Sequence, residues 1–514
     1  MARLLQGYHP HLKSRLITGF TNGFQIPSYA PTPLGEPDNH KSVYLNIDAT
    51  SEKIQTEIDS GRVAGPFDAP PFQPFYVSPL GLIPKKSPGE WRLIQNLSFP
   101  KGTSVNDCMS DEHKRVSYED FDHVMLIIQR LGRGCWIAKS DMAHAFKLLP
   151  VDPESYKFLG FKFKNKYFYD KTMVMGAANS CSNFELLSSA LQWILANKFN
   201  VSHVSHILDD FQFFSMDKNV CASYQTAFHK LCQQIGVPIK HTKTVYPCQV
   251  IELHGLKVDT QARTISLPED KTVKAIKLLT RHSSRKKITL KELQSLIGVL
   301  SFATRAVEGG RAFLRRLIDL TIGVKYPNHH IRLNNEARKD MEAWLIFLNN
   351  FNGILYFRRV DWDSSDTLSL FTDSSNWGFA AVYRDKWTYG TWPHLWSGYH
   401  ITVKEMYPIM LALALWAPML ANRRVIFVTD NQAVAYCIRK QTSKDSLIMR
   451  MLRSLIVCAM RHNIVFTSKW ISTHDNTLAD LLSRNSLSQA RVIAPWLQPH
   501  PEQIPQHLMP WKQL

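Results

Sequence analysis

Short apolar runs bounded by turn residues occur throughout the first half of the chain and predict β-strands. One run, 136–140, ends in Asp141, and two more flank the adjacent pair Asp209 and Asp210 within the stretch 207–214. High β propensity on both sides of that pair predicts a tight hairpin with the two carboxylates at its tip. Because successive strand side chains point to opposite faces, at most one of the pair readily faces a shared site.

Other patterns in this half predict further elements. Apolar residues at helical spacing predict a helix at 51–61, and the stretch 85–94 has the pattern of a strand, a turn and a second strand. Residues 1–40 are rich in Pro, Gly and polar groups, which predicts a flexible leader that is either poorly ordered or draped over the rest of the chain. From about 260 to 325 the pattern becomes helical and basic, with helices expected at 267–279, 290–299 and 310–320.

The pattern changes again near residue 366. Strands are expected at 368–371, 379–383, 387–391, 424–428 and 463–471, and helices at 402–420, 431–439, 443–462 and 476–484. This βββαβαβα order would bring together four acidic residues, which are Asp373, Glu405, Asp430 and Asp480. Two alternatives are simpler, since Thr402-x-x-Glu405 is also a capping box and Asp373 could merely start a turn. Pro408 predicts irregular first turns in the helix that carries Glu405.

Composition narrows the class of protein. A chain of 514 residues is too long for one core, and about three or four domains are expected. The 61 Lys and Arg against 43 Asp and Glu give a net charge of +18, which suits a polyanionic partner. No apolar run reaches the roughly 18 residues that cross a bilayer, so no membrane association is expected. The eight cysteines lack C-x-x-C spacing, which predicts reduced thiols in an intracellular protein, cytoplasmic or nuclear, and no zinc site.

Paired carboxylates give the chain its candidate chemistry. Two unpaired carboxylates about 4 Å apart repel, and a divalent cation is the usual remedy. An isolated Asp-Asp is otherwise a solvated turn, but here a second acidic residue, Asp141, ends an upstream strand. At this point the sequence resembles a reverse transcriptase, with Asp141 and Leu208-Asp209-Asp210 as its two metal-binding motifs. The resemblance implies that Asp141 and Asp209 bind two Mg²⁺ ions, or Mn²⁺ in their place, with Asp210 in support.

The same resemblance implies roles for residues around the carboxylates. Lys85 or Lys86, together with Arg92, would contact the incoming triphosphate, although a basic hairpin can also be plain solvated surface. Phe146 would lie beneath the sugar and exclude a 2′-hydroxyl, where the alternative is an ordinary core Phe. Gly176 would let the backbone approach the base pair closely.

The second half resembles ribonuclease H. That family would use Asp373, Glu405, Asp430 and Asp480 to hold two further Mg²⁺ ions. Many members carry a His before the last Asp. In this chain Trp470 occupies the matching place, and His474 lies nearer to Asp480 in the sequence than the family's His would. No catalytic His is assigned.

Together the motifs resemble the polymerase and ribonuclease H region of DIRS-like retrotransposons, over roughly residues 40–490. The resemblance implies an α+β multidomain chain, a right-hand polymerase followed by a ribonuclease H-like α/β domain with a mixed sheet. Its parts would be a leader (1–40), fingers and palm (41–258), a helical thumb (259–330), a connection (331–366), the ribonuclease H-like domain (367–490) and a tail (491–514).

The activity implied is RNA-directed DNA polymerase with ribonuclease H. Its partners would be an RNA template, a DNA primer, their hybrid and dNTPs, with a separately encoded tyrosine recombinase as a further element protein. Two alternatives stay open: a catalytically inactive nucleic-acid-binding protein retained by a host, and an RNA-directed RNA polymerase. Phe146 and the attached ribonuclease H region weigh against the second.

Overall fold

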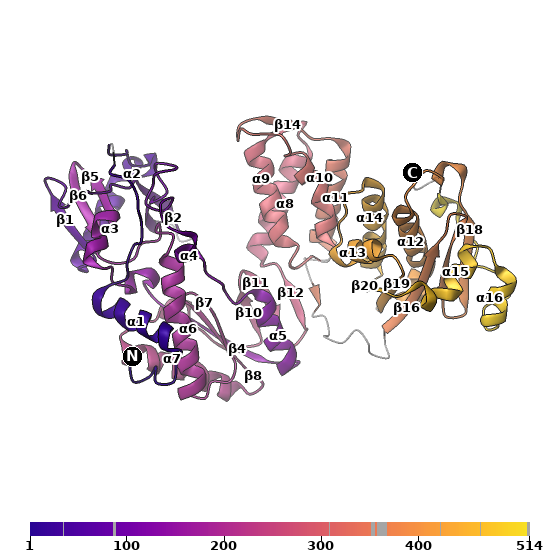
Figure 1. Cartoon of the computed structure of the whole chain (residues 1–514), viewed down its shortest axis with the longest axis horizontal. Helices are drawn as coiled ribbons and strands as arrows, with labels where there is room; N and C mark the ends of the chain where they lie inside the picture. The colour runs from indigo at the N-terminus through magenta and orange to yellow at the C-terminus, as the bar shows by residue number, and fades with distance from the viewer. Residues whose placement is uncertain are drawn as a thin grey trace. The chain divides into compact units, whose positions relative to one another are not determined.

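In a computed structural model of the chain, two compact units are formed by residues 1–251 and 252–514 (Figure 1). The structure describes residues 1–33, 35–85, 89–307, 309–350, 355–356, 367–421, 423–462 and 464–510. Lys86, one of the expected triphosphate contacts, lies outside the described residues. Each unit is described separately below.

A four-stranded antiparallel sheet in the order β7-β8-β4-β9 forms the base of the first unit. Its strands are β4 (Trp136–Asp141), β7 (Val204–Ile207), β8 (Asp210–Ser215) and β9 (Val245–Cys248). The helices α6 (Ser180–Lys198) and α7 (Lys218–Ile235) pack against it. Phe211 and Phe213 on β8 are fully buried with Phe228 on α7, so the apolar strand residues fill the core beneath the sheet.

The ends of α7 show how local sequence sets an element. Asp217 caps its start, because the carboxylate accepts hydrogen bonds from the backbone N–H groups of Asn219 and Val220. Gly236 ends the helix with φ of +76°, a left-handed conformation that glycine adopts without a steric penalty.

The N-terminal segment is ordered, in contrast to the flexible leader that its composition predicts. It forms the helix α1 (Pro10–Asn22) and then runs beside residues 109 and 151 through isolated bridges. Leu5, Leu16 and Phe24 are almost fully buried in the core of the first unit. Composition missed this because these apolar side chains are buried against a core that other segments of the chain form.

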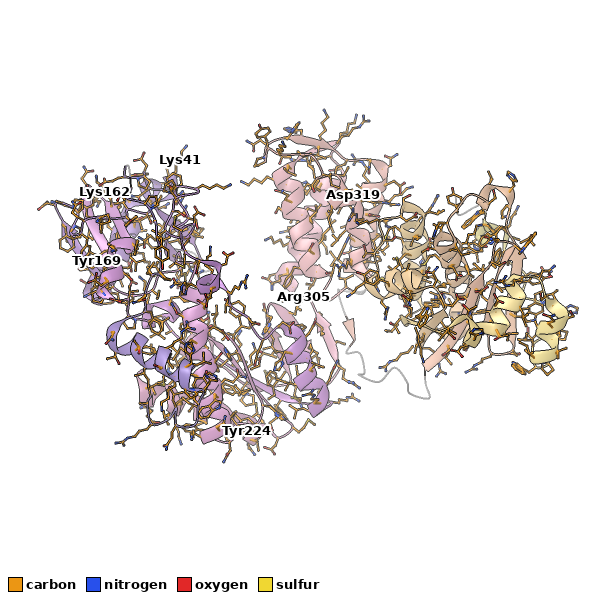
Figure 2. All side chains as sticks on the ribbon, in the orientation of Figure 1. Lys41, Lys162, Tyr169, Tyr224, Arg305 and Asp319 are labelled. Carbon is orange, nitrogen blue, oxygen red and sulfur yellow. The ribbon has the colours of Figure 1, made fainter. Side chains whose placement is uncertain are left out.

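The rest of the first unit consists of small sheets and helices. A three-stranded antiparallel sheet has the order β1-β6-β5, and β2 and β3 form a separate hairpin. Figure 2 shows Lys162 and Tyr169 on β5 and β6 of this sheet. The bounds are β1 (Val63–Phe67), β2 (Leu80–Pro84), β3 (Trp91–Gln95), β5 (Gly160–Phe163), β6 (Lys166–Asp170), α2 (Lys41–Leu45), α3 (Ile47–Asp59), α4 (Asp111–Lys114), α5 (Phe121–Leu131), η1 (Ala145–Leu148), η2 (Pro153–Leu159) and η3 (His241–Lys243).

Helices dominate the first part of the second unit, close to where the sequence predicts them. They follow a small sheet of order β10-β11-β12-β15, and a second pair of strands, β13 and β14, lies among them. The helices are α8 (Glu269–Ser283), α9 (Leu290–Ala303), η4 (Gly310–Phe313), α10 (Arg315–Asp319) and α11 (Asn335–Asn350). The strands are β10 (Val250–Leu253), β11 (Leu256–Asp259), β12 (Thr264–Ser266), β13 (Lys287–Thr289), β14 (His330–Arg332) and β15 (Leu355–Tyr356).

The second part of this unit is a five-stranded mixed sheet of order β18-β17-β16-β19-β20. The first three strands are antiparallel, whereas β19 and β20 join in parallel. The strands are β16 (Thr367–Ser374), β17 (Gly378–Tyr383), β18 (Lys386–Thr391), β19 (Arg424–Thr429) and β20 (Val465–Trp470). The helices are η5 (His394–Trp396), α12 (Ile401–Leu420), α13 (Gln432–Lys440), α14 (Ser446–Arg461), η6 (Thr473–Asn476), α15 (Thr477–Ser483), α16 (Leu487–Ile493) and η7 (Gln506–Leu508).

The helix α12 differs from two expectations. It is long and apolar enough to cross a bilayer, although no such run is expected from the sequence, but 78% of its most apolar window is buried inside the second unit. It is therefore a core helix. It also runs unbroken through Pro408, which has no N–H to offer the carbonyl of Lys404. The hydroxyl of Ser374 donates to that carbonyl at 3.0 Å and replaces the missing bond.

Candidate active sites

Three carboxylates of the first unit meet at the end of the β4–β8 pair. Asp141, the last residue of β4, lies opposite Asp210, the first residue of β8. Asp209 lies in the turn just before, after Leu208 in the left-handed region at φ of +51°. The backbone N–H of Met142 donates to the carbonyl of Asp209 at 2.9 Å and ties the turn to the end of β4. The hairpin is as expected, except that Asp210 already belongs to the strand.

Two lysines hold this cluster together. Lys243, in the short helix η3, lies 2.6 Å from Asp141 Oδ2, and Lys139 on β4 lies 2.7 Å from Asp210 Oδ2. The sequence predictions did not include Lys139. Its spacing could have revealed it, because a residue two positions before Asp141 in a strand faces the same side of the sheet.

The electrostatics of the cluster suit a cation. Burial and the nearby Asp141 charge raise the pKa of Asp209 to about 6. Burial also raises the pKa of Asp210, although Lys139 opposes the rise, and the Oδ1 atom of Asp210 is buried without a hydrogen-bond partner. A buried, unpartnered carboxylate oxygen beside other carboxylates is a ready ligand for a hard divalent cation, so these residues fit a metal site.

The other residues predicted for this site lie around it. Phe146 is half-buried in η1 and meets the ring of Phe184 on α6 edge-on, with centroids 5.6 Å apart. Lys85 and Arg92 lie on the β2–β3 hairpin, where Arg92 is exposed. Among the described residues, the anionic partner of Lys85 is Glu90, at 3.4 Å.

The position of Gly176 has a clear steric reason. A Cβ atom there would lie 1.7 Å from the carbonyl oxygen of Gln95, so only glycine fits. The close approach that the structure shows is to backbone of the β2–β3 hairpin, and the approach to a base pair stays a prediction. Asn106 fixes the same turn, because its side chain donates to the carbonyl of Gly176 at 2.8 Å and accepts from the N–H of Ala178 at 2.9 Å. Asn106 was not among the predicted site residues.

The second unit holds a tighter acidic cluster. Asp373 near the end of β16, Glu405 in the first turns of α12 and Asp430 just after β19 place carboxylate oxygens within 4.8 Å of one another. Among the described residues, this group of three has its ligand atoms close enough together to hold a metal ion without rearrangement. The capping box with Thr402, the alternative role of Glu405, is not formed, because the side chain of His400 caps α12 by accepting from the N–H of Thr402. Glu405 is therefore left free for the cluster.

Burial strongly shifts the pKa values of the carboxyl groups in this cluster. Burial, together with the charges of Asp430 and Asp480, raises the pKa of Asp373 to about 6, although a hydrogen bond from Ser483 opposes the rise. The pKa of Glu405 is raised well above its usual value by burial and by the other two carboxylates. Its Oε2 atom is buried without a hydrogen-bond partner. Three crowded carboxylates with a free buried oxygen fit a divalent cation.

Asp480, the fourth predicted ligand, lies beside the cluster. Its carboxylate is paired with Arg484 at 2.7 Å, one turn along α15. Ser483, between them, donates to Asp373 Oδ2 at 2.5 Å and to the carbonyl of Asp480 at 3.0 Å. The sequence analysis assigned no role to Ser483 or Arg484. They connect Asp480 to the cluster.

The loop after β20 is attached to Asp430. Thr473 donates to Asp430 Oδ2 at 2.8 Å, and the indole N–H of Trp470 donates to the backbone carbonyl of Asp430, also at 2.8 Å. Trp470 is 46% exposed, so its ring borders the cluster from the solvent side. Trp470 occupies the expected place of a catalytic His and makes a structural contact there.

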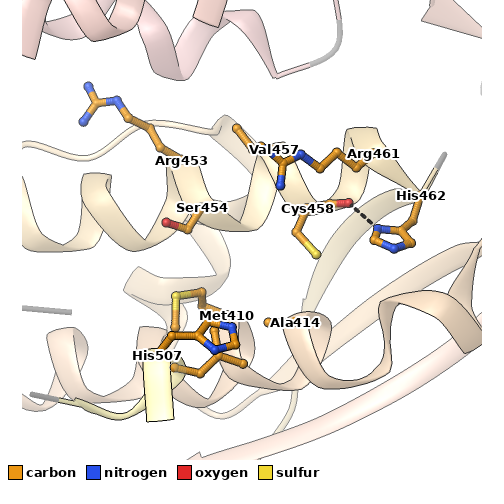
Figure 3. Close-up of a pocket in the computed structure, with 10 residues that line it drawn as sticks. Met410, Ala414, Arg453, Ser454, Val457, Cys458, Arg461, His462 and His507 are labelled. Carbon is orange, nitrogen blue, oxygen red and sulfur yellow. Dashed lines mark hydrogen bonds between the residues drawn. The ribbon is translucent and has the colours of Figure 1, made fainter. Parts of the chain in front are cut away.

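A cavity of about 480 Å³ lies elsewhere in the second unit (Figure 3). It opens between α12 and α14 and is lined by Met410, Ala414, Arg453, Ser454, Val457, Cys458, Arg461, His462, His507 and Leu508. His462 contacts the carbonyl of Cys458 at 3.1 Å. None of the predicted site residues lines this cavity. The candidate chemistry is therefore carried by the two carboxylate clusters.

Comparisons with known families define the class of protein. Residues 83–279 match the family described as reverse transcriptase (RNA-dependent DNA polymerase). Residues 363–456 match the RNase H-like domain found in reverse transcriptase. The first span contains Asp141, Asp209 and Asp210, and the second contains Asp373, Glu405 and Asp430. The chain therefore contains one region that matches the reverse transcriptase family and one that matches the RNase H-like domain found in reverse transcriptase.

Individual relatives are distant. The chain is 21% identical over 384 residues to a putative enzymatic polyprotein of Cassava vein mosaic virus, which covers 70% of this chain and 54% of the polyprotein. It thus spans about half the length of that relative. The fold is similar to two structures of the foamy viral protease-reverse transcriptase in complex with dsDNA, at a TM-score of 0.52 and 16% identity. These cover 87% and 86% of this chain and 73% and 86% of the viral chains. The expected fold class, a polymerase with a ribonuclease H-like α/β domain, is confirmed.

Proposed function

We propose that this chain copies retroelement RNA into DNA and degrades the RNA strand of the resulting hybrid. The observation that carries the proposal is the presence of two separate carboxylate clusters, one within each matched domain. Each contains a buried, unpartnered carboxylate oxygen, on Asp210 and on Glu405. A nucleic-acid-binding protein without activity would have no need of such desolvated carboxylates.

The polymerase step would take place at the end of β4 and β8. Divalent cations, proposed to be Mg²⁺ with Mn²⁺ able to replace it, would be held by Asp141 and Asp209 here and by the cluster around Glu405, and would supply Lewis-acid activation in both sites. Asp210, held by Lys139, supports the arrangement of the other two carboxylates. The primer 3′-hydroxyl attacks the α-phosphate of a dNTP in line and releases pyrophosphate. Lys85 and Arg92 would steady the triphosphate, and Phe146 would exclude the 2′-hydroxyl of a ribonucleotide.

The nuclease step would take place at Asp373, Glu405 and Asp430. Their carboxylates would hold divalent cations, which would supply activation of the attacking water and stabilisation of the leaving 3′ oxygen when the RNA strand is cut. Asp480 would join this site from α15. Its carboxylate is paired with Arg484, which lies one helical turn further along the chain. The hybrid would be read by its backbone, its shape and its 2′-hydroxyls more than by its sequence.

The finer assignment is also a proposal. The motifs around Asp141, Asp209 and Asp480 support a DIRS-like retrotransposon as the source, with a tyrosine recombinase as a partner encoded by the same element. We assign fingers and palm to 41–258, a thumb to 259–330, a connection to 331–366 and the nuclease domain to 367–490. Eight free cysteines support an intracellular setting.

Two variants separate the two activities. With an RNA template, a DNA primer, dNTPs and Mg²⁺, Asp209→Asn should abolish DNA synthesis and leave cleavage of a preformed hybrid intact. Asp430→Asn should do the reverse. Loss of both activities in each variant, with the fold intact by circular dichroism, would contradict two independent sites.

A further inference from the structure

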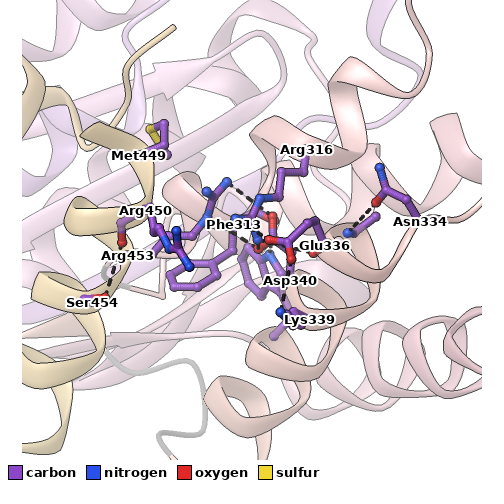
Figure 4. A network of polar contacts seen from close by, with 12 residues as sticks. Phe313, Arg316, Asn334, Glu336, Lys339, Asp340, Met449, Arg450, Arg453 and Ser454 are labelled. Atoms are coloured by element: carbon purple, nitrogen blue, oxygen red, sulfur yellow. Dashed lines mark hydrogen bonds and ion pairs between the residues drawn. The ribbon is translucent and has the colours of Figure 1, made fainter. Parts of the chain in front are cut away.

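A buried ion network joins two parts of the second unit that are far apart in sequence (Figure 4). Asp340 on α11 is 1% exposed and accepts from Arg316 Nη1 on α10 at 3.1 Å. Arg453 on α14 reaches the same carboxylate, with Nε 3.4 Å from Oδ1 and Nη2 3.4 Å from Oδ2. Arg453 is itself 9% exposed and lies over the ring of Phe313, 5.9 Å from its centroid. One carboxylate thus links the helices that follow the polymerase domain to a helix of the nuclease domain.

The backbone also approaches closely at this contact. Gly309, just before η4, has φ of +79°, and a Cβ built there would lie 2.3 Å from Ile456 Cγ2 on α14. The two segments therefore touch, and with Ile456 in place no side chain fits at Gly309. Gly310 is covered in the same way by Trp344 of α11, whose indole N–H donates to the carbonyl of Phe313. The contact is packed and specific in position.

The charges explain why buried Arg453 requires Asp340 as its partner. A guanidinium taken out of water is costly unless it gains a partner, and burying Arg453 lowers its pKa, which Asp340 opposes. Burial raises the pKa of Asp340 to about 6, although both arginines oppose the rise. Arg316 also forms an ion pair with Glu336 at 2.6 Å. If Asp340 is replaced, Arg316 therefore still has an anionic partner. Among the described residues, the ion-pair partner of Arg453 is Asp340.

We propose that Asp340 and Arg453 lock the nuclease domain onto the helices η4, α10 and α11, so that the nuclease domain and these helices move as one body. A consequence follows if the proposed function holds. The nuclease would then cut the RNA at a spacing set by those helices, and loosening the lock would spread the cuts along the hybrid.

A cross-linking experiment tests the contact without any activity. The ideal Cβ at Gly309 lies 3.5 Å from Ile456 Cβ, within the Cβ–Cβ range of disulfides. Gly309→Cys combined with Ile456→Cys should form a disulfide on mild oxidation of the full chain, identified by mass spectrometry of peptides. Gly309→Cys combined with Arg461→Cys is the matched control, since Arg461 is exposed at the last turn of the same helix. Equal yields for the two pairs would overturn the proposal.

A thermal unfolding cycle tests the ion pair. Asp340→Asn should lower the midpoint by about 6 °C or more, because it leaves Arg453 buried without an anion. Adding Arg453→Met to Asp340→Asn should recover most of that loss. Adding Arg461→Met instead is the control and should change the midpoint little. Losses that simply add in the double variant would overturn the lock.

The consequence for cleavage is measured on an RNA template with a labelled 5′ end. The double variant Asp340→Asn, Arg453→Met should broaden the distances between cuts and the primer end, while the rate of dNTP incorporation stays within about twofold. An unchanged cut pattern would overturn the coupled motion. Absence of any activity in the native chain would instead contradict the proposed function, and the cross-link and the unfolding cycle would still decide the lock.

Discussion

Asp141 and Asp210 face each other across the antiparallel pair of β4 and β8, and each carboxylate is held by a different lysine. The strand register brings together two residues that are 69 positions apart in the chain. Lys139, which pairs with Asp210, is on the same strand as Asp141. The strand β4 therefore supplies both a carboxylate of the site and the cation that positions a second one.

Lys139→Met should move the pH dependence of DNA synthesis to higher pH. Lys139 opposes the rise in the pKa of Asp210, so its removal raises that pKa further and keeps the carboxyl protonated to a higher pH. The acid limb of the rate profile should therefore shift upward. Lys230→Met, at an exposed position on α7, is the control and should leave the profile unchanged. An identical profile for both variants would mean that Asp210 does not depend on Lys139.

The nuclease cluster should make the metal-free protein more stable in mild acid. The folded pKa of Asp373 is about 6, above the unfolded value of 3.8, and the pKa of Glu405 is raised as well. Groups with raised folded pKa values contribute stability that is lost as pH rises through those values. In EDTA, the unfolding temperature should therefore decrease as the pH is raised from about 4 to just above 6, the interval between the unfolded and folded pKa values of Asp373. Mg²⁺ should restore it at pH 7, which calorimetry would detect.

Glu405→Gln should weaken that response to metal. A neutral side chain of the same shape removes a buried charge, so the metal-free protein should unfold at the same or a higher temperature at pH 7. Mg²⁺ should then stabilise it less than it stabilises the native chain. A midpoint that rises with Mg²⁺ as much as in the native chain would show that Glu405 is not a ligand.

Gly176→Ala should destabilise the polymerase domain severely. The new Cβ would meet the carbonyl oxygen of Gln95 at 1.7 Å, and backbone must move to relieve the clash. A loss of about 3 kcal/mol or more in the free energy of unfolding is expected, measured by urea denaturation. Gly298→Ala is the matched control, because that position on α9 is open and an alanine there favours helix by up to about 1 kcal/mol.

The elements and most of the candidate site could be predicted from the sequence. The apolar runs around Asp141, Asp209 and Asp373 specify strands, and strand ends place their carboxylates at a common edge. Local pattern could not show contacts set by tertiary structure. The pairing of Arg453 with Asp340, of Ser374 with the Lys404 carbonyl, and of Gly176 with Gln95 each joins residues distant in sequence.

The prediction of a flexible N-terminal segment was wrong for a different reason. Its composition favours disorder, but Leu5, Leu16 and Phe24 are buried against a core that other segments build. Likewise, His400 caps α12 in place of Thr402, since the cap depends on the path of the chain before the helix. Single-sequence patterns describe a segment and not its surroundings.

The most direct test of the account is dNTP incorporation on poly(rA)·oligo(dT) with Mg²⁺, comparing the native chain with Asp209→Asn. Asp209 is half-buried in the turn between β7 and β8, and partial burial and the charge of Asp141 raise its pKa to about 6. The account predicts incorporation by the native chain and none by the variant. Incorporation that survives Asp209→Asn, or tight hybrid binding by a native chain that incorporates nothing, would contradict it.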